Sequence, residues 1–370
     1  MQARDERDMR EALDLAHRGW GRVSPNPLVG AVIVQDGDVV GRGWYEGPRG
    51  GPHAEVRALH EAGVRARGAT VVCTLEPCAH LGSTPPCTLA LIEAGVGRVV
   101  VGAGDPNPVV DGRGISQLRA AGMSVEVGLL AKEARRLNEA FEKHVTTGLP
   151  FVTLKMASSL DGKTAAGDGS SKWITGEQAR ADVQRLRAGA DVVVVGAGTA
   201  VADDPALTVR DERFVGARLP IRVVVDASGR VTPTGRLFNG TAPTLVATTE
   251  RADGELVRRW RNAGAEVLVF DQDQEGGVSV AQLLGELGKR DAQSVLLEGG
   301  PTLAWSFVRD DAIDKVVLYV APRLVGGAEA PSVLMGGGSS PIGDARRVEL
   351  SSIERIGDDI RVEAYVHRDR

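Results

Sequence analysis

The stretch of sequence that decides the fold of the first half of the chain is LEPCAHLGSTPPC, residues 75–87. It contains two of the three cysteines, Cys78 and Cys87, and each directly follows a proline. Upstream stands the tripeptide His53-Ala54-Glu55, which adds an imidazole and a carboxylate. One imidazole and two thiolates make a three-ligand set that suits zinc and leaves a fourth position for water, as in catalytic zinc sites. The two segments therefore predict a catalytic zinc ion held by His53, Cys78 and Cys87.

Glu55 is the predicted catalytic residue of this site. The pattern of residues 53–62 predicts a helix that begins beside His53, so the Glu55 carboxylate can lie next to the water without ligating the metal. Such a position suits a group that takes up and returns a proton. The third cysteine, Cys73, lies in a valine-rich strand at residues 70–75, and we expect it to be part of the core.

His-x-Glu followed by Pro-Cys and a second cysteine is the pattern of zinc nucleobase deaminases, in which zinc activates water for attack on an amino-bearing ring carbon. Eight residues separate the two cysteines here, whereas the common pattern has two. A polynucleotide deaminase shares the motif, but a basic surface and the shorter spacing are typical of that class. A zinc-stabilised binding module without catalysis is a further alternative, and it would need a fourth protein ligand, for which His80 is the candidate.

Length and composition set limits on the class of protein. At roughly 150 residues per domain, the 370 residues of the chain predict two domains. Hydrophobic residues at 42% and charged residues at 25% are typical of a globular protein and exclude fibrous and disordered classes. The net charge is −5 and the basic residues are scattered, so we expect neither a nucleic acid nor a membrane as a partner. An export signal and a long apolar run are both lacking, which predicts a cytoplasmic location.

The hydrophobic periodicity of the first half alternates between helices and strands. Helices are expected around residues 9–16, 53–62, 86–94 and 132–143, and strands around residues 29–34, 39–40, 70–75 and 99–102. The segment Thr-Thr-Gly-Leu-Pro at residues 146–150 ends this pattern, and a new strand begins at Phe151. We therefore place one domain at residues 1–146 and a second at residues 150–370.

The second half alternates in the same way. Strands are expected around residues 151–156, 191–195, 221–226, 244–248, 294–297, 315–321 and 360–367, with helices at 177–188 and 280–289 and a mobile loop at 335–341. The segment GAGTAV at residues 196–201 lacks the third glycine of the dinucleotide fingerprint. The segment EGGPTL at residues 298–303 opens a probable helix, where free N–H groups can hold phosphate. Taken alone, each segment can equally be a simple turn.

The chain as a whole resembles the bifunctional deaminase and reductase family of riboflavin biosynthesis. Its first half has the family patterns PNPxVG, HAE and LEPCxHxGxTPPC at residues 25–30, 53–55 and 75–87, followed by DPNP at residues 105–108. Its second half has similar segments at residues 155–162, 173–175, 202–210 and 298–303. The resemblance implies an N-terminal cytidine-deaminase-like α/β/α sandwich and a C-terminal dihydrofolate-reductase-like α/β domain.

The resemblance also implies the chemistry and the site residues. The first half would deaminate a diaminopyrimidinone that carries a phosphoribosylamino arm, and the second half would reduce that arm. Zn²⁺ and NADPH are the implied cofactors, a phosphorylated pyrimidine is the implied small-molecule partner, and we expect a homo-oligomer, a dimer or larger. The residues implied to bind NADPH are Ala157, Trp173, Thr199, Asp203, Gly300, Pro301, Thr302, Leu303, Ala304, Trp305 and Ser306. Those implied to bind substrate are Asn26, Ser171, Arg187, Leu207, Arg210 and Glu298.

Some assignments within the resemblance stay open. Trp173 can equally be a core residue, because tryptophan is largely buried in most settings. Ala227 stands where the family often has a serine, so a side-chain hydrogen bond to the cofactor is lost there or moves to Ser228. In the first half, His80 and Asp105 are possible assistants of the deaminase.

The reductase leaves two further expectations. Lys155, Asp161 and Asp203 are equal candidates for its proton donor. Arg187 and Arg210 are expected to meet across a cleft and grip the substrate phosphate, because planar guanidinium groups bind phosphate through paired hydrogen bonds.

Overall fold

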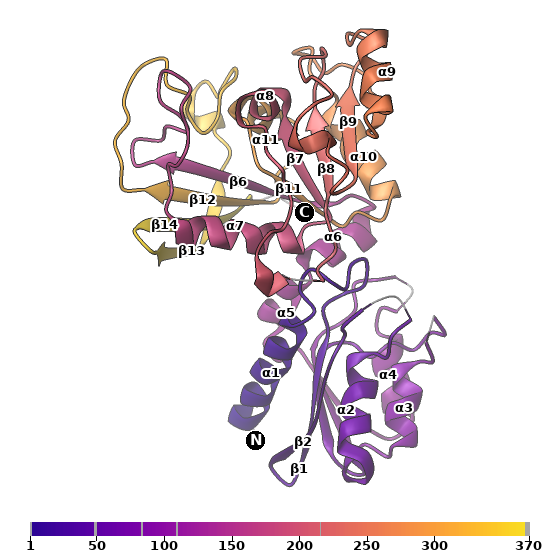
Figure 1. Cartoon of the computed structure of the whole chain (residues 1–370). Helices are drawn as coiled ribbons and strands as arrows, with labels where there is room; N and C mark the ends of the chain where they lie inside the picture. The colour runs from indigo at the N-terminus through magenta and orange to yellow at the C-terminus, as the bar shows by residue number, and fades with distance from the viewer. Residues whose placement is uncertain (1, 48–49, 83, 109, 215, 367–370) are drawn as a thin grey trace. The chain divides into compact units, whose positions relative to one another are not determined.

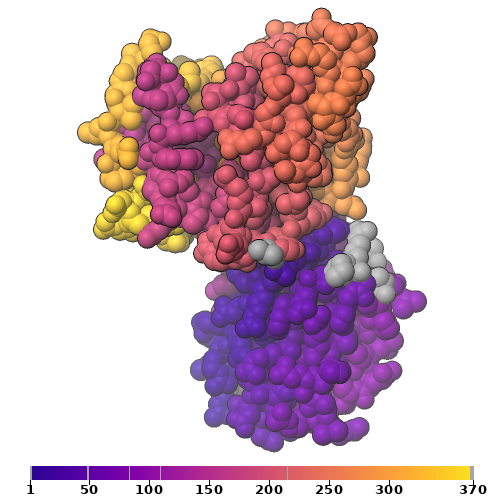
Figure 2. Space-filling model, viewed as in Figure 1, coloured from indigo at the N-terminus to yellow at the C-terminus, as the bar shows by residue number. Residues whose placement is uncertain are grey.

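The chain divides into two units, Met1–Gly148 and Leu149–Arg370, hereafter unit 1 and unit 2. The computed structural model describes residues 2–47, 50–82, 84–108, 110–214 and 216–366. In the space-filling view the indigo to purple residues of unit 1 gather in one body, and the magenta to yellow residues of unit 2 gather in another (Figure 2). Each unit has its own sheet and its own core, so each is described by itself.

Unit 1 contains one five-stranded sheet and six described helices (Figure 1). The helices are α1 (Gln2–His17), α2 (Ala54–Ala62), α3 (Cys87–Glu93), α4 (Arg113–Ala120), α5 (Ala131–Leu137) and α6 (Glu139–Thr147), with a 3-10 turn η1 (Gly63–Ala66). The strands are β1 (Gly30–Gln35), β2 (Asp38–Trp44), β3 (Thr70–Leu75), β4 (Arg98–Ala103) and β5 (Ser124–Val127). Their order is β2-β1-β3-β4-β5, in which β1 is antiparallel to β2 and β3, while β3, β4 and β5 run parallel.

The sheet of unit 1 is covered by helices on both faces. Successive strand residues point to opposite faces, so Val72 packs with Met9 of α1, whereas Val71 packs in the cluster that contains Ala58 of α2 and Leu91 of α3. Figure 1 shows α1 on one side of the sheet and α2, α3 and α4 on the other. This arrangement is the expected α/β/α sandwich.

Helix α2 packs closely on β2 because both present small residues to each other. An added Cβ at Gly41 would lie 2.2 Å from the Ala58 carbonyl oxygen, and one at Gly43 would lie 2.0 Å from the Ala54 oxygen. Neither approach leaves room for a side chain. The contact holds the first turn of α2, which follows His53, against the sheet.

One expected helix of unit 1 is wrong. The pattern predicts a single helix over residues 132–143, but the structure ends α5 at Leu137 and begins α6 at Glu139. Asn138 between them is buried, and its amide group exchanges hydrogen bonds with the Leu28 backbone, at 2.8 Å from Leu28 N–H and 2.9 Å to Leu28 C=O. The break therefore anchors the loop ahead of β1.

Unit 2 contains one nine-stranded sheet with helices on both faces (Figure 1). The helices are α7 (Glu177–Gly189), α8 (Ala197–Asp203), α9 (Gly254–Asn262), α10 (Val280–Lys289) and α11 (Pro301–Arg309), with 3-10 turns η2 (Glu212–Phe214), η3 (Arg236–Phe238) and η4 (Ile342–Asp344). The strands are β6 (Phe151–Ser159), β7 (Val192–Gly196), β8 (Ile221–Val225), β9 (Thr244–Thr248), β10 (Glu266–Val269), β11 (Ser294–Leu297), β12 (Lys315–Ala321), β13 (Val348–Ile356) and β14 (Asp359–Val366).

The strands of unit 2 follow the order β10-β9-β8-β7-β11-β6-β12-β14-β13. Strands β10 to β12 along this order are parallel, and β14 is antiparallel to both β12 and β13. Val194 of β7 packs in the core with α10 and α11, whereas its neighbour Val193 packs in the cluster with α8. The central strands are therefore buried on both faces, which explains their runs of valine.

The sequence pattern predicted most of these elements and missed others. Strands β9, β11 and β12 and helix α10 have the expected bounds. Helix α9 and strands β10 and β13 were not expected. The end of the strand expected at residues 360–367 falls on His367, which lies outside the described residues. Among the described helices, none combines the length and the apolar character that crossing a bilayer requires.

Candidate active sites

The predicted zinc ligands of unit 1 come together at the ends of two helices. His53 precedes α2, Cys87 begins α3, and Cys78 lies in the loop after β3. The Nδ1 atom of His53 lies 3.2 Å from Cys87 Sγ and 3.6 Å from Cys78 Sγ. The three ligand atoms lie within 4.8 Å of one another, and they are the only such cluster of His, Cys, Asp and Glu found among the described residues. This donor set fits zinc with one position left open.

The two thiols differ in acidity because one donates to the other. The Cys87 thiol donates to Cys78, and with His53 and the Cys87 backbone N–H it lowers the pKa of Cys78 to about 4 despite burial. The Cys87 N–H, at the start of α3, lies 3.3 Å from Cys78 Sγ. The hydrogen bond that the Cys87 thiol donates to Cys78, together with burial, raises the pKa of Cys87. A helix N-terminus that faces the sulfur therefore favours the thiolate that metal binding requires.

Glu55, the predicted catalytic residue, is buried near the predicted zinc ligands. It lies in the first turn of α2 and is 3% exposed, and its Oε2 atom has no hydrogen-bond partner among the described residues. Burial raises the pKa of Glu55 from 4.5 to about 7. A buried carboxylate with an unsatisfied oxygen beside three metal-ligand atoms has an unfilled hydrogen-bonding requirement, which a water at the open metal position would meet.

Two residues that support the zinc ligands were not found from the sequence. Thr84 Oγ1 lies 3.2 Å from Nε2 of His53, the ring nitrogen that points away from the sulfurs. When Nε2 donates to this hydroxyl, Nδ1 is the ring nitrogen left to bind metal. Thr88 binds the Cys78 carbonyl oxygen through its N–H at 3.2 Å and its hydroxyl at 3.3 Å. The signal available in the sequence was their position, because Thr84 lies inside the cysteine motif and Thr88 directly follows it.

Asn26 is connected to the predicted zinc ligand His53 through one intermediate residue, Tyr45. Its Nδ2 atom lies 3.1 Å from Tyr45 Oη, and the Tyr45 ring meets the His53 ring edge to face at 5.8 Å between centroids. Asn26 therefore belongs to the surroundings of the predicted zinc site. Tyr45 was not singled out from the sequence.

Glu76 is a buried carboxylate that shapes the loop on the other side of the cysteines. Its two oxygens accept hydrogen bonds from the backbone N–H groups of Asp105, Gly112, Gly114 and Ile115, at 2.8–3.3 Å. These contacts hold Asp105 and residues 112–115 next to Glu76, which directly precedes Pro77 and Cys78 in the chain. Asp105 is itself 8% exposed, and burial raises its pKa to about 6.

His80 does not act as a fourth ligand in this structure. It is exposed, and it is not part of the cluster of ligand atoms formed by His53, Cys78 and Cys87. The alternative of a closed, purely structural zinc site therefore has no support from the described residues. Cys73 is fully buried, as predicted for a core residue.

In unit 2 several of the predicted cofactor residues lie on the helices that follow β7 and β11. Helix α8, with Thr199, follows β7 directly, and α11 follows β11 after Glu298, Gly299 and Gly300. The Gly196 N–H donates to the Gly299 carbonyl oxygen at 2.9 Å. An added Cβ at Gly300 would lie 3.1 Å from Thr199 Oγ1, so the two helix starts approach through glycine. Free N–H groups at such helix starts suit the phosphates of a dinucleotide.

The residues of the 300–306 run do not all face the same way. Ala304 is fully buried in the core, so its side chain packs under α11. Trp305 is covered by the loop at Gly336, where an added Cβ would lie 1.9 Å from Trp305 Cδ1. Gly300 caps α11, and Pro301 is its first residue. Thr302 is exposed, and Leu303 and Ser306 are partly buried.

Two residues predicted to bind substrate bind each other. Arg187 of α7 and Glu298 form a bidentate ion pair, with Nε to Oε1 at 2.5 Å and Nη2 to Oε2 at 2.7 Å. Their side chains are 12% and 5% exposed. Lys155 of β6 completes the group, with its Nζ 3.9 Å from Glu298 Oε2. Burial lowers the pKa of Lys155. Burial alone would raise the pKa of Glu298, but the neighbouring Arg187 charge lowers it below its usual value.

Asp203 contacts residues 171 and 172, which connects two of the segments that the sequence assigns to the reductase site. Its Oδ1 atom accepts from the Ser171 hydroxyl at 3.4 Å and lies 3.8 Å from Lys172 Nζ. Trp173, next along the chain, is 61% exposed with the Arg180 guanidinium 4.8 Å above its ring, so the core alternative for Trp173 is wrong. Ala157 of β6 is partly buried against the cluster that includes α7.

Arg210 and Leu207 lie on the loop after α8. The Arg210 N–H donates to Gln184 Oε1 at 2.8 Å, which ties the loop to α7 one turn before Arg187. The Arg210 residue is exposed, whereas Leu207 is 2% exposed. Asp161 accepts from the Ser159 hydroxyl at 2.5 Å and from the N–H groups of residues 325 and 326, so it anchors a loop, and these hydrogen bonds lower its pKa to about 2.

Comparison with known protein families matches both halves of the chain. Residues 2–103 match the family described as the cytidine and deoxycytidylate deaminase zinc-binding region. Residues 150–362 match the family described as the RibD C-terminal domain.

Individual relatives match over nearly the whole chain. The riboflavin biosynthesis protein RibD of Escherichia coli is 43% identical over 366 residues, which cover 96% of this chain and 98% of that protein. The RibD of Bacillus amyloliquefaciens is 42% identical over 361 residues, covering 97% and 96%. The Acinetobacter baumannii RibD structure superposes with a TM-score of 0.87 at 38% identity, covering 100% of each chain.

A Thermotoga maritima structure, described as a diaminohydroxyphosphoribosylaminopyrimidine deaminase and 5-amino-6-(5-phosphoribosylamino)uracil reductase, superposes with a TM-score of 0.88 at 37% identity, covering 99% of each chain. Both halves of the chain are thus matched. The chain belongs to the RibD family of bifunctional deaminase and reductase enzymes of riboflavin biosynthesis.

Proposed function

We propose that unit 1 hydrolyses the ring amino group of 2,5-diamino-6-(5-phosphoribosylamino)pyrimidin-4(3H)-one, and that unit 2 reduces the ribosyl arm of the product to give 5-amino-6-(5-phosphoribitylamino)uracil. The observation that carries the proposal is the buried, unsatisfied Glu55 oxygen beside the His53, Cys78 and Cys87 ligand atoms. The full-length relatives supply the choice of substrate, because the Thermotoga maritima protein is described by these two activities.

In the deamination, His53, Cys78 and Cys87 are the proposed zinc ligands and Glu55 is the proposed proton carrier. Zinc held by these residues would lower the pKa of its bound water to about 7 and so supply a nucleophile at neutral pH. Glu55 would accept one proton of the water and deliver it to the ring nitrogen, and would then carry the second proton, from the oxygen added to the ring, to the amino group. A carbon–oxygen bond forms, the carbon–nitrogen bond breaks, and ammonia leaves. Asn26 is proposed to orient the pyrimidine.

In the reduction, the proposed NADPH residues are those at the starts of α8 and α11 together with Ala157, Trp173 and Asp203. NADPH supplies a hydride, which reduces C1 of the ribosyl arm. We assign the proton donor to Lys155, because its largely buried ammonium lies at the Glu298 pair and burial lowers its pKa. Asp161 is less suited, since its carboxylate is already an acceptor for two backbone N–H groups and a hydroxyl.

The proposed substrate residues of unit 2 are Ser171, Arg187, Leu207, Arg210 and Glu298. Within this set Arg210 is exposed, and we assign it the substrate phosphate. Arg187 already binds Glu298 on two nitrogens, so we propose that it acts on substrate mainly by fixing the Glu298 carboxylate. This division of roles replaces the expectation that both arginines grip the phosphate equally.

The proposed domain boundary lies between residues 146 and 150. Contacts within the chain separate at Gly148 and Leu149, and the reductase-family match begins at residue 150. We expect residues 1–147 to fold as a deaminase that does not need NADPH, and residues from 149 onward to fold as a reductase. Failure of both fragments to fold would mean that the halves depend on each other.

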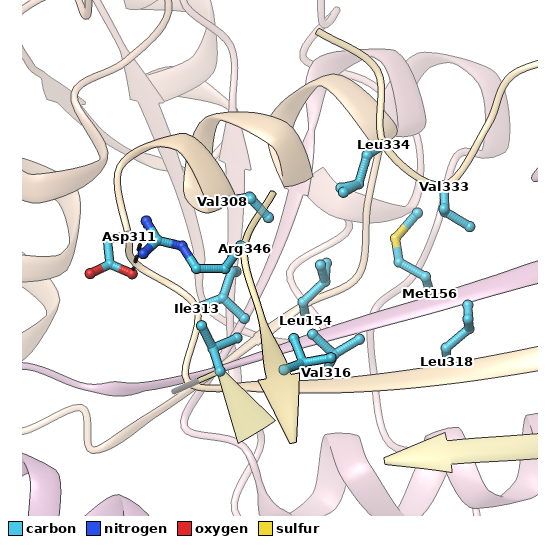
Figure 3. A pocket seen from close by; sticks show the side chains of 12 residues that line it. Leu154, Met156, Val308, Asp311, Ile313, Val316, Leu318, Val333, Leu334 and Arg346 are labelled. Atoms are coloured by element: carbon cyan, nitrogen blue, oxygen red, sulfur yellow. Dashed lines mark ion pairs between the residues drawn. The ribbon is translucent and has the colours of Figure 1, made fainter. Parts of the chain in front are cut away.

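We propose that the protein forms a homo-oligomer through the β13 end of unit 2. Leu350 of β13 pairs with Ala364 of β14, and Ile353 pairs with Val362, so these four apolar residues share one face of the sheet. Leu350 and Ile353 are 59% and 64% exposed. Next to this face, Leu154, Met156 and Leu318 line an apolar cavity of about 170 Å³, with the Asp311–Arg346 ion pair at one end (Figure 3).

A second copy of the chain is the occupant that fits this edge. An antiparallel pair of β13 strands centred on Ser352 would place Glu349 of one copy opposite Arg355 of the other, twice. Ile353→Glu should reduce the sedimentation mass to that of one chain. The control is Val64→Glu, at a 95% exposed position of unit 1, which should sediment like the original protein. A single-chain mass for the original protein would contradict the proposal.

We also propose a cytoplasmic location. All three cysteines are free, which suits a reducing compartment.

The direct test of the function is to incubate the purified protein with the diaminopyrimidine phosphate. Ammonia should be released without NADPH. Added NADPH should be oxidised only when the deaminated product is present. A protein that oxidises NADPH but releases no ammonia would contradict the assignment of unit 1.

A further inference from the structure

The loop that follows α8 adopts a backbone conformation that its residues do not favour. Asp204 and Leu207 have φ angles of +41° and +52°, in the left-handed region that side chains disfavour. Such conformations persist when surrounding contacts fix them, and they are common at ligand sites. Asp203, the last residue of α8, and Leu207 and Arg210 of this loop are proposed to bind cofactor or substrate. The contacts that hold this loop are therefore of functional interest.

Arg236, in the turn η3, holds the first residues of the loop. Its backbone N–H donates to Asp204 Oδ1 at 2.7 Å, and its guanidinium Nε donates to the Asp204 carbonyl oxygen at 2.6 Å. A second guanidinium nitrogen, Nη2, reaches the Asp203 carbonyl oxygen at 3.3 Å. The side chain is 48% exposed, so these contacts do not depend on burial in the core.

Arg222, in β8, holds the next part of the loop from inside. The residue is fully buried. Its Nη1 atom donates to the carbonyl oxygens of Ala206 at 3.3 Å and Arg236 at 2.9 Å, and its Nη2 atom donates to that of Ala242 at 2.6 Å. The planar guanidinium thus joins the loop to the segment that contains Arg236. Nη1 also donates to Asn239 Oδ1 at 3.4 Å. Because the other three partners are backbone oxygens, the side chain mainly fixes the path of the chain.

Gly235 allows the two segments to approach. Its φ is +88°, and an added Cβ would lie 2.4 Å from Asp204 Oδ1, the atom that accepts from Arg236 N–H. Gly240, five residues further on, has a similar φ of +74°, and nothing lies within 4 Å of its added Cβ. A comparison of substitutions at Gly235 and Gly240 therefore separates the steric contact with Asp204 from the general cost of a side chain at positive φ.

We infer that Arg222 and Arg236 form a positioning clamp that holds the 203–207 loop in its strained conformation, and so sets the positions of Leu207 and Arg210 for substrate binding by the reductase. The inference rests on the proposed function of unit 2. Neither arginine is placed in contact with substrate or cofactor. They act through the backbone of the loop, so their loss should weaken substrate binding more than it slows the chemical step.

The test compares Gly235→Ala and Arg236→Ala with the control Gly240→Ala in the full chain. For the first two variants, the reductase KM for the deaminated substrate should rise about three- to tenfold, as expected for the loss of one or two hydrogen bonds, while kcat stays within about twofold. Arg236→Lys, which keeps one donor, should recover part of the KM. Gly240→Ala should match the original protein. The kcat of the reductase reports that unit 2 is folded in each variant, and all variants should deaminate at the original rate, because unit 1 is unchanged.

Arg222→Lys examines the inner half of the clamp, because it keeps the charge and loses the planar fork. Amide hydrogen exchange over residues 203–210 gives a readout that does not need reductase activity. Exchange there should be faster in Gly235→Ala, Arg236→Ala and Arg222→Lys than in Gly240→Ala. Unchanged exchange, or faster exchange with an unchanged KM, would overturn the clamp. If the original protein reduces no substrate, the proposed function fails, and the exchange rates still decide whether the clamp exists.

Discussion

The zinc site of unit 1 and the reductase site of unit 2 are built from different kinds of information. Cys78 and Cys87 lie 25 and 34 residues after His53 in the chain. Each of these three residues is of a type that has few other uses in such a pattern. Arg187 and Glu298 are common surface residue types, they are 111 residues apart, and they form a buried pair only because α7 packs beside the end of β11. The first site is recognisable from chemistry, whereas the second depends on the fold.

This difference has a consequence for mutation. Loss of one group in the zinc site removes a chemical function, because no neighbour can replace a ligand or a proton carrier. Loss of one group in the reductase site leaves a buried partner without its counter-charge, so stability and binding change together. The predictions below test that contrast in order of expected size.

The largest effect is expected for Glu55→Gln. The amide keeps the size of the side chain but cannot carry a proton, so deamination should fall by about 10²- to 10⁴-fold. Zinc measured by elemental analysis should stay at the original level, because Glu55 is not among the clustered ligands. Glu93→Gln, an exposed position on α3, is the matched control and should leave the rate unchanged. Deamination by Glu55→Gln at a normal rate would remove Glu55 from the mechanism.

The second effect concerns the buried ion pair. Arg187→Ala or Glu298→Gln leaves one charged or polar partner buried, so each should lower the free energy of unfolding of unit 2 by about 3–5 kcal/mol. Denaturation of the full chain, followed by hydrogen exchange in peptides of unit 2, measures this loss. Arg185→Ala, on the same helix with a side chain that is 43% exposed, should cost far less. Equal losses at residues 185 and 187 would show that the pair has no special role.

The third effect separates binding from stability. Arg210 is exposed, so Arg210→Ala should leave unit 2 stable while it raises the reductase KM about ten- to hundredfold, through loss of a charged hydrogen bond worth about 1.5–3 kcal/mol. Steady-state kinetics with varied substrate and varied NADPH measures both constants. A change in the KM for NADPH instead would place Arg210 on the coenzyme.

The smallest effect is a pH dependence in unit 1. Burial raises the pKa of Asp105 from 3.8 to about 6, so its contribution to stability is present below pH 3.8 and is lost as the pH rises through 6. Asparagine imitates the neutral form, so Asp105→Asn should gain about 2 kcal/mol relative to the original protein between pH 4 and pH 7. Asp111→Asn, at an exposed position of the same loop, is the control. A gain in the opposite direction would contradict the shift.

Local pattern was sufficient for much of the fold. The runs of β9, β11, β12 and α10 are apolar enough to mark their own bounds. The break at Asn138 was missed because a buried asparagine has no signal in periodicity, and its purpose lies with Leu28, 110 residues away. Strand β13 was missed because its residues are mostly exposed, and it pairs with β14 on one side only in the described sheet.

The candidate sites show the same limit. The zinc ligands and Glu55 follow from residue type and order. Thr84 and Glu76 do not, because a threonine or glutamate in such a motif acquires its role only when the fold brings the His53 ring or the Gly114 backbone to it. The ion pair of Arg187 with Glu298 likewise requires two elements that only the folded sheet brings together.

The contrast between the sites is tested most directly by giving one variant both substrates. The Glu55→Gln protein should reduce the already deaminated pyrimidine phosphate with NADPH at the original rate, while it fails to release ammonia from the diamino compound. That result would show two chemistries on one chain, one of which is lost with a single carboxylate. Loss of both activities in a folded, zinc-containing Glu55→Gln protein would contradict the account.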